Sequence, residues 1–141
     1  MSEKNVFEKI RDREIPTEFL YEDDDIMAFY DIAPIAPVHV LIVPKKRIVS
    51  IADMADGDEM IVGQMFRVAR DVARDLNISE KGYKLLFRVG RDGGQEVPHL
   101  HLHLLGGARL SENIHPVRSR SPQGGRSRAS GGAASNGVNP Q

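Results

Sequence analysis

Three histidines at alternating positions near residue 100 most constrain what this chain can form. His99, His101 and His103 are separated by leucines, and the whole sequence holds only five histidines. Because successive side chains of a β-strand point to opposite faces, this run predicts three imidazoles on one face and apolar side chains on the other. A row that one small ligand can touch is typical of an active site rather than of core packing.

The remaining apolar pattern predicts an α+β fold. Residues 3–13 have helical spacing, with Ser2 as the candidate N-cap, and residues 58–76 repeat with the period of a long amphipathic helix. The run 38–43 is almost continuously apolar, which favours a central strand. Short connections between most strands predict a mainly antiparallel sheet. Five strands are expected, at residues 18–21, 26–31, 38–43, 83–89 and 100–105.

Composition divides the chain into two parts. Residues 1–110 carry a formal net charge of −4 and hold the apolar pattern, whereas residues 111–141 carry +3 and are rich in Ser, Gly and Arg. We predict one domain over 1–110 and a basic, disordered tail over 111–141. The acidic domain argues against a dedicated nucleic-acid surface.

The expected location is the cytoplasm, without membrane contact. No stretch reaches the roughly 18 apolar residues that cross a bilayer. The charged N-terminal segment lacks the apolar region of a signal peptide. The chain has no cysteine, which excludes disulfides and thiolate chemistry.

The histidine row can be read in three ways. The outer Cα atoms of three alternating residues lie about 13 Å apart, so the row does not readily supply three ligands to one tetrahedral metal ion. A metal site on two of them needs a further ligand, for which His39 and Glu96 are candidates. A neutral imidazole is also a nucleophile towards phosphorus when its second nitrogen is held by an acceptor. The third interpretation is a solvent-exposed strand face without a role.

The run from His99 to Leu105 resembles the HxHxHxx signature of the histidine triad (HIT) superfamily. Residues 92–97 and the pair Gly106-Gly107 resemble its Hint branch, the purine nucleoside phosphoramidases. Similar segments extend the match over roughly residues 5–107. The resemblance implies a HIT fold, a homodimer with a sheet continuous across both subunits, a purine nucleotide substrate, and no metal or other cofactor.

The resemblance also implies a role for each matching residue. His101 matches the nucleophile that attacks the α-phosphorus and forms a nucleotidyl-histidine. His103 matches the residue that contacts the phosphate oxygens, His99 the one that orients the nucleophile, and His39 a fourth, supporting histidine. Asp31 matches the acid that binds the ribose hydroxyls. The remaining nucleotide-binding candidates are an apolar clamp around the base (Phe7, Ile10, Phe29, Ile32) and residues beside the phosphate (Arg88, Gly94, Gln95, Glu96).

The implied activity is hydrolysis of the P–N bond of purine nucleoside 5′-phosphoramidates. Arg88 stands where many Hint relatives carry Asn, Glu96 where some carry Ser, and Pro98 where an aromatic residue is usual. An ion pair between Arg88 and Glu96 is a further expectation. The alternatives are a dinucleoside polyphosphate hydrolase, against which the run 93–97 argues, and a nucleotide-binding regulatory protein with weak catalysis.

Overall fold

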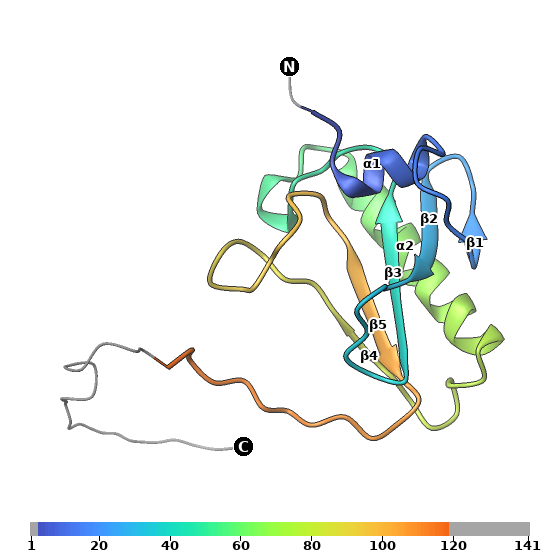
Figure 1. The fold of residues 1–141 in the computed structure, drawn as a ribbon, viewed down its shortest axis with the longest axis vertical. Helices are drawn as coiled ribbons and strands as arrows, with labels where there is room; N and C mark the ends of the chain where they lie inside the picture. Colours follow the sequence, from blue (N-terminus) through green and yellow to red (C-terminus); the bar gives the residue numbers. More distant parts are fainter. Residues whose placement is uncertain (1–2, 119–141) are drawn as a thin grey trace. The chain divides into compact units, whose positions relative to one another are not determined.

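Five strands form one antiparallel sheet in the order β1-β2-β3-β5-β4 (Figure 1). The computed structural model describes residues 3–118. The expected α+β class, the five strands and the central place of β3 are confirmed, because β3 pairs with β2 on one side and with β5 on the other. The strands are β1 (Tyr21–Glu22), β2 (Ile26–Tyr30), β3 (Val38–Pro44), β4 (Lys84–Leu86) and β5 (Leu102–Gly106).

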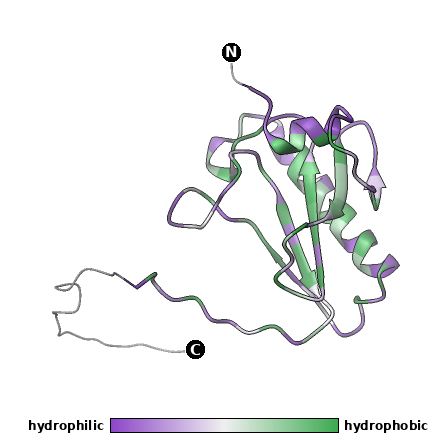
Figure 2. Ribbon diagram, in the orientation of Figure 1, coloured by the Kyte–Doolittle hydropathy of each residue, from purple (hydrophilic) through white to green (hydrophobic). Residues whose placement is uncertain are grey.

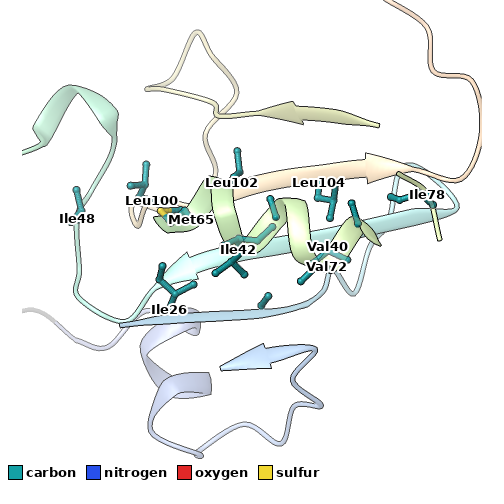
Figure 3. Packing of buried hydrophobic residues seen from close by; sticks show 14 residues of the cluster. Ile26, Val40, Ile42, Ile48, Met65, Val72, Ile78, Leu100, Leu102 and Leu104 are labelled. Carbon is teal, nitrogen blue, oxygen red and sulfur yellow. The ribbon is translucent and has the colours of Figure 1, made fainter. Parts of the chain in front are cut away.

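One face of the sheet packs against the long helix α2 (Asp58–Asp75), as the helical period predicts. Alternate strand residues point to this face, and together with the apolar side of α2 they form the main core (Figure 3). A short 3-10 helix, η1 (Ile51–Asp53), lies in the connection from β3 to α2. The core includes Ile26, Val40, Ile42, Met65, Val72, Leu102 and Leu104.

The opposite face of the sheet is covered by the short helix α1 (Val6–Arg11). Phe7 and Ile10 of this helix pack on Phe29 and Leu41 in a second, smaller apolar cluster. The expected N-cap was wrong: the cap is Asn5, whose side chain accepts from the amide of the third helical residue. Ser2 lies outside the described residues.

Three of the expected strands have different limits. The runs 18–21 and 83–89 yield only β1 and β4, because a strand continues only where a partner backbone is present. The last strand begins at Leu102, so His99 and His101 precede it. The amide of His99 donates to the Val97 carbonyl at 2.8 Å and the amide of Leu100 to the Ile48 carbonyl at 2.6 Å, outside the sheet.

The chain divides into two units after Leu110. Hydrophobic residues follow the strands and the inner sides of the helices, whereas the connecting loops are largely hydrophilic (Figure 2). Residues 111–118 form no helix or strand, and the rest of the predicted tail, residues 119–141, lies outside the described residues. Within residues 3–118, no helix is long and apolar enough to cross a membrane.

Candidate active site

Four histidines gather on the sheet face that α1 covers. His39 of β3 and His103 of β5 lie on neighbouring strands, since Leu41 pairs with His103 and His39 with Leu105. The rings of His101 and His103 have centroids 5.0 Å apart, and those of His39 and His103 are 5.2 Å apart. The Phe7 ring touches His101 at 5.0 Å and His99 at 5.5 Å. The fold therefore brings the three row histidines and His39 together.

The tautomer of His101 follows from its hydrogen bond. Its Nδ1 lies 2.7 Å from the backbone oxygen of His99. A carbonyl only accepts, so Nδ1 carries the proton and Nε2 keeps the lone pair. His101 is only partly buried, unlike His99 and His103. This arrangement gives one imidazole an accessible nucleophilic nitrogen and a backbone acceptor behind it.

His99 is completely buried and has a partner on each ring nitrogen. Its Nε2 donates to the Pro44 carbonyl at 2.8 Å, and its Nδ1 accepts from the Asn5 side-chain amide at 3.0 Å. Asn5 at the same time caps α1, with its Oδ1 accepting from the Glu8 amide at 2.9 Å. One asparagine therefore joins the start of the helix to the histidine whose carbonyl holds His101. Sequence reasoning missed this residue, although Asn before an apolar helical run is an N-cap signal.

The helix cap beside His99 is itself fixed by a partly buried ion pair. Glu8 accepts from the Asn5 amide at 3.1 Å, which completes a capping box. The Arg47 guanidinium also donates to both oxygens of Glu8. The hydrogen bonds from Arg47 outweigh the effect of burial and lower the pKa of Glu8 to about 2. The N-terminal helix is thus tied to the segment after β3.

His39 and His103 form a second pair, linked to Arg88. His39 Nε2 lies 2.9 Å from His103 Nδ1, and Arg88 Nη1 lies 3.0 Å from His103 Nε2. The Ile35 amide N–H points at His39 Nδ1, and the two nitrogens are 3.2 Å apart. A carboxylate oxygen of Asp31 is 3.4 Å from His39 Nε2, while its other oxygen accepts from the Ala33 amide at 2.8 Å.

Burial keeps the cluster uncharged. Desolvation is the largest cause that lowers the pKa values of His39, His99 and His101. It also lowers the pKa of His103 to about 3, with the positive charges of His101, Arg88 and His39 acting in the same direction. At neutral pH the imidazoles are therefore neutral, the form in which an imidazole is nucleophilic.

The four residues of the expected base clamp do not come together. Phe7, Ile10 and Phe29 are buried in one apolar cluster, with Phe7 against the histidines. Ile32 is 100% exposed, in the loop after β2. The clamp residues thus provide three core side chains and one solvent-exposed side chain.

The residues expected beside the phosphate lie in the turn before the histidine row. The side-chain amide of Gln95 bridges this turn, because it accepts from the Gly90 amide at 3.0 Å and donates to the carbonyls of Val49 at 2.6 Å and Val97 at 3.0 Å. Glu96 is exposed, and its charge raises the pKa of His101 slightly against the effect of burial. The expected ion pair between Arg88 and Glu96 is absent from residues 3–118, since Arg88 contacts His103 instead.

A metal ion has one candidate set of donors in the described part of the chain. Donor atoms of Asp31, His39 and His103 lie within 4.8 Å of one another. The two facing histidine nitrogens are 2.9 Å apart, closer than the roughly 3.3 Å between ligands of a tetrahedral zinc with bonds of about 2.0 Å. Arg88 places a positive charge on the same histidine pair. These residues fit a hydrogen-bonded network better than a cation site.

Comparisons with known proteins agree with this geometry. The HIT domain family model matches residues 12–110. A purine nucleoside phosphoramidase from Escherichia coli (strain K12) is 46% identical over 110 residues, which are 78% of this chain and 92% of the relative. A solved HIT family hydrolase from Legionella pneumophila Philadelphia 1 is 45% identical, with a TM-score of 0.75 over 77% of this chain and 97% of that one. A solved HIT family hydrolase from Clostridium thermocellum is 43% identical, with a TM-score of 0.77, and the match covers 82% of this chain and 100% of that one.

Proposed function

The chain belongs to the HIT domain family and is a hydrolase of that family, and on this premise we propose that it cleaves the P–N bond of purine nucleoside 5′-phosphoramidates. The observation that carries the proposal is the state of His101. Its Nδ1–H is held by a backbone carbonyl at 2.7 Å, which leaves a lone pair on Nε2. The purine nucleoside phosphoramidase at 46% identity supports the substrate class.

In the first step, His101 Nε2 attacks the α-phosphorus and the P–N bond breaks. The phosphorus is then bound to Nε2 as a nucleotidyl-histidine, and the amine leaves after taking up a proton from the solvent. The positive charge that develops on the imidazole is shared through Nδ1–H with the His99 carbonyl. Donors fixed beside the phosphoryl oxygens stabilise the transition state, and His103 is placed for this role next to His101.

In the second step, water attacks the same phosphorus and the P–Nε2 bond breaks. The products are a nucleoside monophosphate and the neutral His101, and the proton that the water loses returns to the solvent, which balances the proton taken up by the amine in the first step. His39 and His99 act through the two reacting histidines and are positioning residues. Asp31 supplies a carboxylate for the ribose hydroxyls, and Arg88, Gly94, Gln95 and Glu96 are assigned to the phosphate side of the nucleotide. Of the four residues expected at the base, Phe7, Ile10 and Phe29 form the apolar cluster beside the histidines, whereas the exposed Ile32 reaches the base only if its loop closes over the ligand.

Turnover of a fluorogenic adenosine phosphoramidate tests the proposal. We expect activity that survives EDTA and falls by about 10³-fold or more in His101→Ala, because no other group takes over the covalent step. His115→Ala is the matched control, since His115 is exposed at the far end of the described chain. Mass spectrometry of the quenched reaction should show one nucleotidyl group on the wild type and none on His101→Ala. Equal turnover by His101→Ala would contradict the mechanism.

The alternative substrates are separated in the same assay. Faster hydrolysis of diadenosine polyphosphates than of the amidate would assign the protein to that neighbouring activity. Tight binding of AMP without turnover of either substrate would assign it a regulatory role. The cytoplasmic location expected from the sequence stays a prediction.

We also propose that the protein is a homodimer joined through β4. This strand is the last in the order of the sheet that residues 3–118 form, and a second copy of the chain can extend a sheet at such an edge. Phe66 of α2 lies 41% exposed beside Phe87, with ring centroids 5.8 Å apart. Light scattering coupled to size exclusion measures the mass, and a monomer at micromolar concentration would contradict this assignment.

A further inference from the structure

A chain of four groups links the Ile35 amide, His39, His103 and the Arg88 guanidinium. The three contacts along it measure 3.2, 2.9 and 3.0 Å. Each contact needs one hydrogen and one lone pair. A backbone amide and a guanidinium nitrogen only donate, and each neutral imidazole offers one N–H and one lone pair. Three contacts therefore share two lone pairs, so the chain lacks one acceptor.

The shortage cannot be removed by moving protons between the two imidazoles. If Arg88 donates to His103 Nε2, the proton of His103 is on Nδ1 and points at His39 Nε2. His39 then carries its own proton on Nδ1. This N–H faces the N–H of Ile35, so the contact has two donors and no acceptor. Protonating either ring would remove a further lone pair, and burial already lowers the pKa values of both histidines.

Asp31 favours the opposite positions for the two imidazole protons. Its carboxylate oxygen, 3.4 Å from His39 Nε2, favours a proton on that nitrogen. The proton of His103 is then on Nε2 and points at the Arg88 guanidinium. Two donors then face each other at that contact, and this is the mismatch. The two contacts of His39 with Ile35 and Asp31 are the longest in the network, at 3.2 and 3.4 Å. In the ligand-free protein the mismatch therefore lies at His39, and Arg88 holds His103 with its proton on Nδ1.

We propose that the missing acceptor is a phosphate oxygen of the ligand, and that Arg88 binds this phosphate by exchanging its contact with His103 for one with the anion. This inference rests on the proposed nucleotide function of the site. When the phosphate enters, Arg88 and the Nε2–H of His103 both donate to its non-bridging oxygens. His103 Nδ1 then accepts from His39 Nε2, and His39 Nδ1 accepts from the Ile35 amide. Each histidine keeps one proton, so no proton is gained or lost.

The turn beside Arg88 leaves room for the exchange. A Cβ atom on Gly94 would lie 3.3 Å from Arg88 Cδ, so the arginine side chain runs directly along this glycine. Gly94 has a φ of +85°, a conformation that glycine adopts without strain. The space that a side chain at position 94 would take is therefore left to the Arg88 side chain.

The permanent positive charge of Arg88 determines which phosphate ligand binds more tightly. Arg88 attracts a phosphate dianion more strongly than a monoanion. A nucleoside monophosphate with a terminal phosphate carries the larger charge, whereas a nucleoside phosphoramidate, with one ester and one amide bond on phosphorus, carries one negative charge. We therefore expect the protein to retain its monophosphate product more tightly than its substrate.

Binding measurements on Arg88 variants test the charge preference. We expect Arg88→Met to weaken AMP binding by about 10- to 100-fold and to leave adenosine binding unchanged. Arg88→Lys should recover part of the AMP affinity. Arg91→Met is the matched control, since Arg91 is an arginine of the same turn whose side chain is 97% exposed. Equal loss of AMP and adenosine affinity, or no loss of either, would overturn the proposal.

Nitrogen-15 NMR of the imidazoles tests the exchange itself. In the wild type, His103 Nε2 should change from unprotonated to protonated when AMP or inorganic phosphate is added. In Arg88→Met it should be protonated before any ligand is added, so that AMP causes no change. A His103 tautomer that is the same in the free and bound wild type would overturn the inference. Neither measurement uses turnover, so a protein that fails to hydrolyse amidates while showing the exchange would defeat only the proposed function.

Discussion

The two halves of the histidine cluster differ in how their hydrogen bonds are matched. In the half formed by His99 and His101, three ring nitrogens have hydrogen-bond partners, and each donor meets an acceptor. In the half formed by His39 and His103, three contacts share two lone pairs. The first half has one possible tautomer for each ring, and the second half has none that satisfies all its contacts.

This difference separates two tasks within one site. A nucleophile needs its lone pair in one place throughout the cycle, and the matched half provides it by anchoring His99 to α1 and β3. A phosphate-binding group needs to change partners when the ligand arrives, and the unmatched half is ready to do so. In the proposed mechanism, fixed and exchangeable hydrogen bonds therefore lie side by side on one sheet face.

The largest effect should come from removing the anchor of the matched half. His99→Ala leaves the Pro44 carbonyl and the Asn5 amide without their partner and opens a cavity against Phe7. We expect a loss of about 3 kcal/mol in the free energy of unfolding, measured by urea denaturation. His115→Ala, at an exposed position, should change it by less than about 0.5 kcal/mol. A loss below about 1 kcal/mol would mean that His99 is not an anchor.

Acidification should destabilise the protein, because all four clustered histidines have lowered pKa values in the folded state, and the pKa of His103 is lowered to about 3. The folded-state pKa of His103 is lowered from 6.5 to about 3, so between these values the unfolded chain binds a proton that the folded protein does not. Stability is therefore full above pH 6.5 and falls with decreasing pH, by up to about 1.4 kcal/mol per pH unit for this group. Glu8, lowered from 4.5 to about 2, adds a further loss only below pH 4.5.

Urea denaturation curves at several values between pH 7 and pH 4 measure this slope. His103→Gln removes the titrating group and should give a flatter dependence. An unchanged free energy of unfolding across this range in the wild type would contradict the neutral, buried state of the pair.

A smaller effect should follow when the helix cap is kept and the amide donor is lost. In Asn5→Asp, the carboxylate still caps α1 but cannot donate to His99 Nδ1. We expect about tenfold slower amidate turnover and a raised pKa of His99, because the new carboxylate favours the imidazolium. Asn5→Ala loses the cap as well and should cost about 1 kcal/mol of stability. Full activity of Asn5→Asp with an unchanged His99 would show that Asn5 is only a cap.

The smallest effect on stability should come from the exposed clamp residue. Ile32 is 100% exposed, so Ile32→Ser should change the free energy of unfolding by less than about 0.5 kcal/mol. If Ile32 contacts the base, adenosine binding weakens several-fold while inorganic phosphate binding stays the same. An unchanged adenosine affinity would remove Ile32 from the nucleotide site.

The elements with a long, clear period were predictable. The helical repeat at residues 58–76 gave α2 at Asp58–Asp75, and the apolar run at 38–43 gave the central strand Val38–Pro44. The limits of strands that need a partner to continue were not predictable. The run 83–89 yields only Lys84–Leu86, where β5 is opposite. Strand limits depend on the neighbouring backbone, which a local pattern does not contain.

The same contrast holds for the site. The alternation at His99, His101 and His103 predicted a shared face, and the family resemblance added His39, which the fold places beside His103. Neither indicated that Asn5 would bind His99 across 94 positions of the chain, or that Arg88 would meet His103 rather than Glu96. Such contacts follow from the packing of α1 on the sheet and from the path of the turn at residues 90–98.

Periodicity and residue chemistry are local properties, so the class of fold, the central strand, the long helix and the identity of the clustered imidazoles were predictable from the sequence alone. The tertiary structure decided which nitrogen of each imidazole faces a donor and which faces an acceptor. Those partners come from five separate places in the chain, at Asn5, Asp31, Ile35, Pro44 and Arg88, and only folding brings them within hydrogen-bond distance.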